Sequence, residues 1–217
     1  MDGMAAAPEK KPLDESEVDR FLRLSQKKYF STRILAKATY IPDMMLGDID
    51  APITIYVYNS IFGCGYCWGF HLNEWKLIKK EYVDTGKVRL VFRELPLDDR
   101  SLGAFMLARC ASDDIPKKYF QIIDEFFKST KKGCSNDCIL EIIKRSGMSN
   151  KQINFCLKNK ELMRNIRKNI DITYNNFGVS GAPTIFINGR KVEGRYKIDK
   201  YRRIIEDELE RAKSEEN

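Results

Sequence analysis

The sequence of 217 residues predicts an α/β fold in which a sheet domain is interrupted by an all-helical insertion. Three observations support this prediction. Residues 53–58 and 88–92 are continuous runs rich in β-branched and aromatic side chains, typical of strands buried on both faces. Residues 101–176 show only helical periodicity. Strand chemistry returns at residues 184–187, directly before the tight turn at Asn188 and Gly189.

The elements of the sheet domain follow in order along the chain. A turn at residues 47–52 leads into the first strand, and Trp68, Leu72 and Trp75 then recur at i, i+4 and i+7, which predicts a helix. With the strand at 88–92 the order is strand, helix, strand, as in a right-handed βαβ crossover. A last helix is predicted from one apolar face, formed by Ile198, Tyr201, Ile205 and Leu209.

The chain divides into four predicted parts. Residues 1–13 are small and charged, so we expect a disordered leader; they lack the basic and apolar regions of a signal peptide, and none is expected in this sequence. Residues 14–40 show a helical pattern and are expected to form an N-terminal helix. We assign residues 41–100 and 177–217 to the sheet domain, and residues 101–176 to the helical insertion.

The composition restricts the classes of function. The hydrophobic fraction of 43% is ordinary for a globular protein, and no apolar run approaches the roughly 18 residues that span a bilayer. The 38 Lys and Arg residues against 31 Asp and Glu give a net charge of +7, but the basic residues are scattered. This pattern favours a solvated basic face over nucleic-acid binding. Six cysteines favour an oxidising compartment.

The motif Cys64-Gly65-Tyr66-Cys67 opens the first predicted helix, directly after a buried strand. Unpaired backbone N–H groups and the positive end of the helix dipole stabilise a thiolate at such a position. We therefore expect Cys64 to be the nucleophile and Cys67, one turn inside the helix, to resolve mixed disulfides. The chemistry predicted from this motif is thiol–disulfide exchange.

A zinc site is the alternative interpretation of this motif. Cys64 and Cys67 would then supply half of the ligands, and Cys134 with Cys138, or His71, would complete the set. The second pair of cysteines lies far away in the sequence without the glycine or histidine pattern of a zinc knuckle, so we expect no metal and no cofactor.

Further blocks extend the match beyond the cysteines. Residues 47–58, the motif itself, Arg93 to Leu97 and Val179 to Gly189 stand in the same order as in the DsbA-like periplasmic disulfide oxidoreductases, which the chain resembles. The resemblance implies a thioredoxin fold with an inserted all-helical domain. It also implies oxidation of dithiols in secreted proteins, with disulfide isomerisation in some branches of the family.

The resemblance also implies a substrate-binding segment at Ala182 and Pro183. In thioredoxin folds this proline is cis, and the residue before it offers its backbone to an extended substrate. Ala182 is small where relatives often have valine or threonine. We add Gly65 and Tyr66, between the two cysteines, to the expected substrate-binding residues. The alternative is a proline that merely starts a strand.

Two positions depart from the family pattern. Relatives commonly have a buried carboxylate six residues before the nucleophile, where this chain has Tyr58, and some have an acid seven residues after it, where this chain has His71. We assign neither residue as a catalytic acid or base. His71 lies one turn beyond Cys67 and is a candidate proton shuttle, although a single histidine on a helix is more often a packing residue.

The other four cysteines lie in predicted helices. Some family members have a second disulfide within the inserted domain, so the resemblance implies that Cys110 pairs with Cys156. Free buried thiols are the alternative for these two residues. Cys134 and Cys138 are separated by four positions, which just permits a disulfide, and their state is left open.

The expected function is oxidation of unfolded or reduced secreted proteins in the periplasm, which is compatible with recycling by a membrane-bound redox partner. The alternatives are an oligomeric disulfide isomerase and a non-enzymatic zinc-binding or chaperone-like module. In residues 14–38 only Leu22 and Tyr29 keep a seven-residue spacing, so we favour a monomer over an oligomer. The apolar residues of that helix are instead expected to dock on the parent domain: Phe21, Leu22, Phe30 and Ile34.

Overall fold

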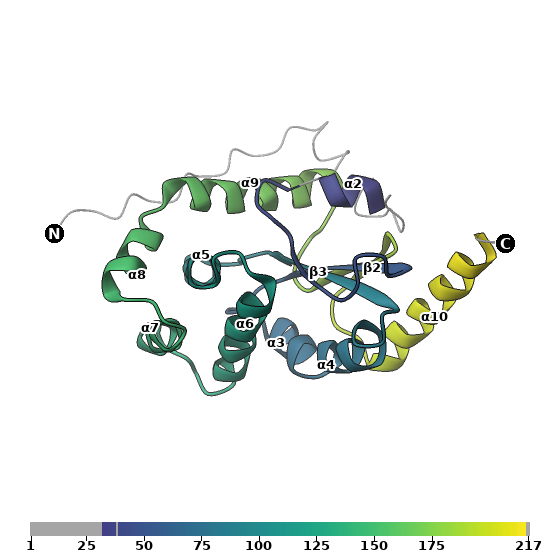
Figure 1. Ribbon diagram of the computed structural model, residues 1–217, viewed down its shortest axis with the longest axis horizontal. Coiled ribbons are helices and arrows are strands. Elements are labelled where there is room, and N and C mark those ends of the chain that lie inside the picture. The colour runs from purple at the N-terminus through teal and green to yellow at the C-terminus, as the bar shows by residue number, and fades with distance from the viewer. Residues whose placement is uncertain (1–31, 38, 216–217) are drawn as a thin grey trace.

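The computed structural model describes residues 32–37 and 39–215 (Figure 1). The leader expected at residues 1–13 and most of the helix expected at 14–40 lie outside the described residues. Within them, helix α2 (Thr32–Lys37) buries Leu35 completely. Ile34, which we expected to dock on the parent domain, is 58% exposed, so this expectation is wrong. The two residues are neighbours on a helix, where side chains one position apart point in different directions.

The centre of the fold is a five-stranded sheet with the strand order β1-β3-β2-β4-β5. Strands β2 and β3 are parallel, and every other neighbouring pair is antiparallel. Strand β2 is buried at all seven positions, which explains its uninterrupted apolar sequence. The strands are β1 (Met44–Leu46), β2 (Ile53–Asn59), β3 (Val88–Glu94), β4 (Thr184–Ile187) and β5 (Arg190–Glu193).

Helices connect and cover the strands. Between β2 and β3 lie α3 (Gly65–Leu72), α4 (Glu74–Ile78) and the π-helix η1 (Lys79–Val83). Between β3 and β4 lie α5 (Asp99–Ser112), α6 (Pro116–Thr130), α7 (Asn136–Arg145), α8 (Asn150–Leu157) and α9 (Lys160–Phe177). Helix α10 (Ile198–Glu215) follows β5. None of the helices formed by the described residues is long and apolar enough to cross a bilayer.

The helix after the cysteines is broken, whereas the sequence pattern predicted a continuous one. The break lies at Asn73, between α3 and α4. The Asn73 side chain donates to the Gly69 carbonyl oxygen at 2.7 Å, and the Asn73 backbone N–H donates to the same oxygen. An asparagine side chain that competes for a helix carbonyl in this way favours termination, which periodicity does not report.

The helices form layers on the two faces of the sheet, as Figure 1 shows: α2 and α9 lie on one face, and α3, α4 and α10 on the other. The direction of side chains alternates along β2. Ile55 and Val57 therefore join the larger core with α3 and α10, while Tyr56 and Tyr58 join the smaller core, beneath α2 and α9.

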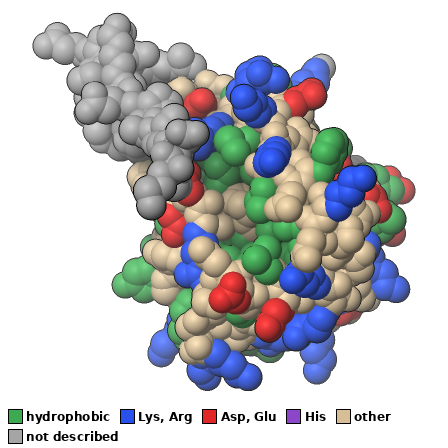
Figure 2. All heavy atoms as spheres, turned by 90° about the vertical axis from the view of Figure 1, so that its left-hand side faces the viewer, with side chains coloured by type: hydrophobic (Ala, Val, Ile, Leu, Met, Phe, Trp, Pro, Cys, Tyr) green, Lys and Arg blue, Asp and Glu red, His purple; other side chains and the backbone are tan. Residues whose placement is uncertain are grey.

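The larger core continues without a break from the sheet into the helices between β3 and β4. Phe92 of β3 makes ring contacts with Phe105 of α5 and with Tyr119 and Phe120 of α6. Figure 2 shows the face on the left-hand side of Figure 1, where helices of this region lie. On this face, Lys and Arg side chains are spread around a central area of exposed hydrophobic side chains. Phe155 of α8 is 77% exposed.

Candidate active site

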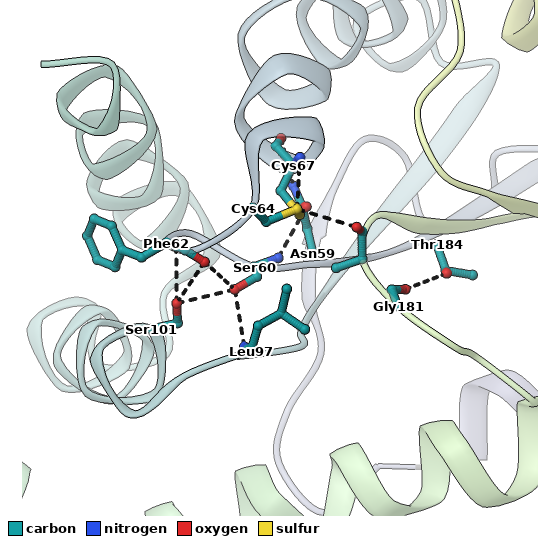
Figure 3. The surroundings of a disulfide bond; sticks show 10 residues. Asn59, Ser60, Phe62, Cys64, Cys67, Leu97, Ser101, Gly181 and Thr184 are labelled. Carbon is teal, nitrogen blue, oxygen red and sulfur yellow. Dashed lines mark hydrogen bonds between the residues drawn. A yellow bond between two sulfur atoms is a disulfide. The ribbon is translucent and has the colours of Figure 1, made fainter. Parts of the chain in front are cut away.

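Cys64 and Cys67 form a disulfide at the N-terminus of α3, directly after the loop that follows β2 (Figure 3). Cys64 is the N-cap of the helix, and its Sγ accepts a hydrogen bond from the backbone N–H of Cys67 at 3.1 Å. Cys64 is partly exposed, whereas Cys67 is completely buried. An incoming thiolate therefore reaches the sulfur of Cys64 and not that of Cys67.

The start of α3 favours negative charge on Cys64. The first turn contains no acidic residue, and the Cys67 N–H already points at the Cys64 sulfur. A helix N-terminus stabilises an anion at this position through its free N–H groups and its dipole. The same arrangement makes Cys64 a good nucleophile when it is reduced, and a good leaving group in a mixed disulfide.

The segment before β4 lies against the cysteine pair. Strands β2 and β4 pair with Tyr58 opposite Thr184, so the chain before Thr184 runs beside the loop that leads to Cys64. The carbonyl oxygen of Ala182 lies 3.3 Å from Cys64 Sγ, and the peptide bond between Ala182 and Pro183 is cis. Thr184 Oγ1 donates to the carbonyl oxygen of Gly181 at 2.7 Å and closes this turn (Figure 3).

Of the four predicted substrate-binding residues, Pro183 is buried and the other three are accessible to different degrees. Tyr66 is 70% exposed, Gly65 is exposed, and Ala182 is partly exposed. Apart from the adjoining backbone, no heavy atom lies within 4 Å of the position that a Cβ on Gly65 or on Gly181 would take. The structure thus brings Gly65, Tyr66 and Ala182 to the accessible side of the disulfide.

A buried hydroxyl network that the sequence did not reveal supports the loop before Cys64 (Figure 3). Ser101 Oγ, at the start of α5, lies 3.2 Å from Ser60 Oγ and accepts from the Phe62 backbone N–H at 3.1 Å. Ser60 Oγ also accepts from the Leu97 N–H at 3.3 Å. The sequence gives little indication of this network, because short polar residues after a strand or at the start of a helix are common in turns and caps.

Asn59 places a polar side chain next to the buried Cys67. It is completely buried; its Nδ2 donates to the Cys67 carbonyl oxygen at 3.5 Å, and its Oδ1 accepts from the Ser60 N–H. Tyr58 belongs to the core on the other face of the sheet, where Arg93 donates to its hydroxyl at 2.9 Å. Burial raises the pKa of Tyr58, although Arg93 acts in the opposite direction. Tyr58 therefore lies in a different core from Cys67.

Comparisons with known proteins decide the family. A family model described as thioredoxin matches residues 39–207. The chain belongs to the thioredoxin family.

Relatives within the thioredoxin family indicate the kind of reaction that the chain catalyses. A relative from Rickettsia typhi, named as a protein-disulfide oxidoreductase, is 26% identical over 202 residues, which are 91% of this chain and 74% of that one. A disulfide bond formation protein D from Bacillus anthracis is 28% identical, with 79% and 81% covered. The crystal structure of alpha-DsbA1 from Wolbachia pipientis has a TM-score of 0.74 at 27% identity, with 87% and 100% covered.

These relatives show that this thioredoxin-family chain is a DsbA-like thiol–disulfide oxidoreductase. The chain spans 64 to 66% of the length of three further Rickettsia relatives.

His71, the candidate proton shuttle, is buried in this oxidoreductase. Its ring stacks between Phe127 and Trp75, with ring centroids 3.9 and 5.1 Å away, and its Nε2 lies 2.6 Å from Asp124 Oδ1. Nδ1 is buried without a hydrogen-bond partner. Burial lowers the pKa of His71, and the hydrogen bond to Asp124 opposes this shift without reversing it. These contacts describe a packing residue rather than a group bonded to either sulfur.

The remaining cysteines of the oxidoreductase are also paired. Cys110 of α5 is joined to Cys156 of α8, and Cys134, before α7, is joined to Cys138 in its first turn. Within residues 32–37 and 39–215, no group of three His, Cys, Asp or Glu side chains is placed to hold a metal ion.

Proposed function

We propose that the chain introduces disulfides into secreted or periplasmic proteins by dithiol exchange through Cys64 and Cys67. The observation that carries this proposal is the asymmetry of the pair: Cys64 is partly exposed at the helix N-terminus, and Cys67 is completely buried. An enzyme that accepts a substrate thiolate at one defined sulfur needs that sulfur to be accessible and the sulfur of the second cysteine to be shielded.

The exchange has two steps. A substrate thiolate attacks Cys64 Sγ, the bond between Cys64 and Cys67 breaks, and its electron pair leaves on Cys67. A second substrate thiolate then attacks the substrate sulfur of the mixed disulfide and releases Cys64 as a thiolate. The substrate gains a disulfide and the Cys64–Cys67 pair is reduced. Stabilisation of the Cys64 thiolate by the start of α3 favours the second step.

We place the substrate beside Ala182 and Pro183. The Ala182 carbonyl oxygen lies 3.3 Å from Cys64 Sγ, and an extended peptide that pairs with this backbone puts its own cysteine next to the reacting sulfur. Hydrogen bonds to the substrate backbone do not depend on the substrate's side chains, which suits an enzyme that acts on many unfolded chains. Gly65 leaves room at the approach, and the exposed ring of Tyr66 offers an apolar contact.

All six cysteines are paired in disulfides. Disulfides persist in oxidising compartments, so this pairing supports an oxidising location for the protein. We propose the periplasm as the location, unfolded or reduced secreted proteins as the substrates, and a membrane-bound redox partner as the source of oxidising equivalents.

The test is oxidation of a reduced model peptide that contains two cysteines and a fluorescent reporter. Cys64→Ala is expected to abolish oxidation, because no accessible sulfur is left at the helix start. Cys67→Ala is expected to accumulate a mixed disulfide when it is offered an excess of a disulfide-bonded peptide, because Cys67 is no longer present to attack Cys64 Sγ and release the peptide. Lys128→Met, at an exposed residue outside the site, is the control and keeps turnover. Oxidation by Cys64→Ala at the wild-type rate would disprove the assignment.

A further inference from the structure

The disulfide between Cys134 and Cys138 lies next to the active site. Cys134 and Cys64 line the same cavity of about 380 Å³, between the start of α3 and the loop that joins α6 to α7. The cavity opens at the surface, since Gly65 and Gly133 on its walls are exposed. The other disulfide of the helical region, which joins Cys110 to Cys156, does not line this cavity.

The two cysteines of this second disulfide differ in position and in burial: Cys134 is 6% exposed and Cys138 is partly exposed, the reverse of the order at the active site. Cys134 lines the cavity, whereas Cys138 lies in the first turn of the ten-residue helix α7, three positions after its N-cap Ser135. Cys67 has the same position relative to its own N-cap, Cys64. A helix N-terminus favours a thiolate on Cys138, opposed in part by Asp137 in the same turn, so Cys138 is suited to be the leaving group.

We propose that Cys134–Cys138 is a second redox-active disulfide, which reoxidises the reduced Cys64–Cys67 pair within the same molecule. This inference rests on the proposed function only in that it takes Cys64 as the nucleophile. In contrast to Cys110–Cys156, whose ring closes 46 positions, the ring between Cys134 and Cys138 closes only four and is stabilised less by chain entropy.

The exchange balances without an added oxidant. The Cys64 thiolate attacks Cys134 Sγ, the bond between Cys134 and Cys138 breaks, and its electron pair leaves on Cys138. Cys67 then attacks Cys64 Sγ and releases Cys134 as a thiolate. One disulfide is reduced and one is formed, and the two protons of the Cys64 and Cys67 thiols pass through solvent to Cys134 and Cys138. A fully oxidised chain therefore carries two usable oxidising equivalents.

The walls of the cavity suit this reaction. Arg100 lines it, with its guanidinium 4.2 Å from the centre of the Phe62 ring, and a cation there stabilises the negative charge that is shared by three sulfurs during exchange. The exchange requires the loop at residues 131–135 to move so that the sulfurs of Cys64 and Cys134 meet. Lys131, Lys132 and Gly133 of this loop are exposed, and Gly133 has a φ of 73°, which a glycine adopts without strain.

The first test traps the intermediate. In Cys67→Ser/Cys138→Ser, one equivalent of diamide at micromolar protein is expected to join Cys64 to Cys134, as detected by peptide mapping after an acid quench. The matched control is Cys67→Ser/Cys134→Ser, in which Cys64 and Cys138 are expected to remain unjoined, because Cys138 does not line the cavity. Absence of the Cys64–Cys134 link in monomeric protein would overturn the proposal.

The second test counts equivalents without oxygen. The oxidised wild type, given an excess of a reduced dithiol peptide, is expected to oxidise two equivalents per chain, and Cys134→Ser/Cys138→Ser only one. Cys110→Ser/Cys156→Ser is expected to retain two. One equivalent from the wild type, or reduction of Cys134–Cys138 in Cys64→Ser, would overturn the relay while leaving the proposed function intact. A Cys64–Cys134 link without any oxidation of peptide would support the exchange and contradict the proposed function.

Discussion

Arg109 of α5 binds the carboxylate of Glu94 at the end of β3 through two hydrogen bonds, from Nε at 2.7 Å and from Nη2 at 3.0 Å. Both side chains are 3% exposed, and the Tyr119 hydroxyl donates to the same carboxylate at 2.7 Å. This ion pair ties the sheet to the helices between β3 and β4 in the interior of the protein.

Removing one partner of this ion pair leaves a buried charge without its counterion. We expect Arg109→Met to lower the free energy of unfolding by about 3–5 kcal/mol. The control is Lys128→Met, which breaks the exposed pair with Glu125 and should cost less than about 1 kcal/mol. Urea unfolding at pH 7 measures both changes. Equal losses of unfolding free energy in the two variants would show that the buried pair stabilises the fold no more than the exposed pair does.

The two active-site cysteines should differ in reactivity after reduction. We expect iodoacetamide to alkylate Cys64 at pH values below about 8, since the start of α3 favours its thiolate, while Cys67 stays unmodified because it is completely buried. Mass spectrometry of peptides from the native, reduced protein gives the ratio. Equal labelling of both residues would contradict the assignment of the nucleophile.

The disulfide between Cys110 and Cys156 should be structural. Its loop of 46 positions corresponds to about 4 kcal/mol of stabilisation in the chain-entropy model, so Cys110→Ala/Cys156→Ala should lose about that amount. A mild reductant that opens Cys64–Cys67 should leave it closed, as non-reducing peptide mapping will show. Reduction of both disulfides at the same potential would argue against this role.

His71 should make stability depend on pH. Its pKa is lowered below the ordinary 6.5 by burial, so the unfolded state binds more protons than the folded state as the pH falls through that value. The contribution of neutral, buried His71 to the free energy of unfolding is therefore complete above about pH 6.5. Below this pH the free energy of unfolding decreases, by at most about 1.4 kcal/mol per pH unit. Urea unfolding between pH 5 and 7.5 measures this slope.

The chain has a single histidine, which makes the test specific. His71→Phe keeps a ring between Phe127 and Trp75 but cannot titrate, so its stability should be nearly flat over the same range. Parallel curves for the two proteins would show that His71 does not cause the dependence.

The protein should be a monomer that acts mainly as an oxidase. The spacing of apolar residues at 14–38 does not sustain the seam that a helical stalk needs. Light scattering coupled to chromatography at micromolar concentration should give the mass of one chain. A dimer or trimer that becomes monomeric when residues 1–40 are deleted, with loss of activity on scrambled ribonuclease, would indicate an isomerase instead.

Local patterns were enough to predict the parts of this fold that local physics controls. The continuous apolar runs predicted β2 and β3, and the helix that begins beside Cys64 followed from the periodicity of Trp68, Leu72 and Trp75. The three-residue strand β1 was not predicted, because so short a segment has no periodicity and depends on pairing with β3.

The sequence by itself determined the α/β class and the cysteine motif with its helix start, because burial on both faces and a helix N-terminus are encoded within a few neighbouring residues. Only the tertiary structure decided which distant groups meet. It brought Ala182 to within 3.3 Å of Cys64 across 118 positions, placed Asn59 rather than Tyr58 beneath Cys67, and set Cys134 on the wall of the cavity that Cys64 lines. Such contacts depend on strand register and helix packing, which no local pattern of residues contains.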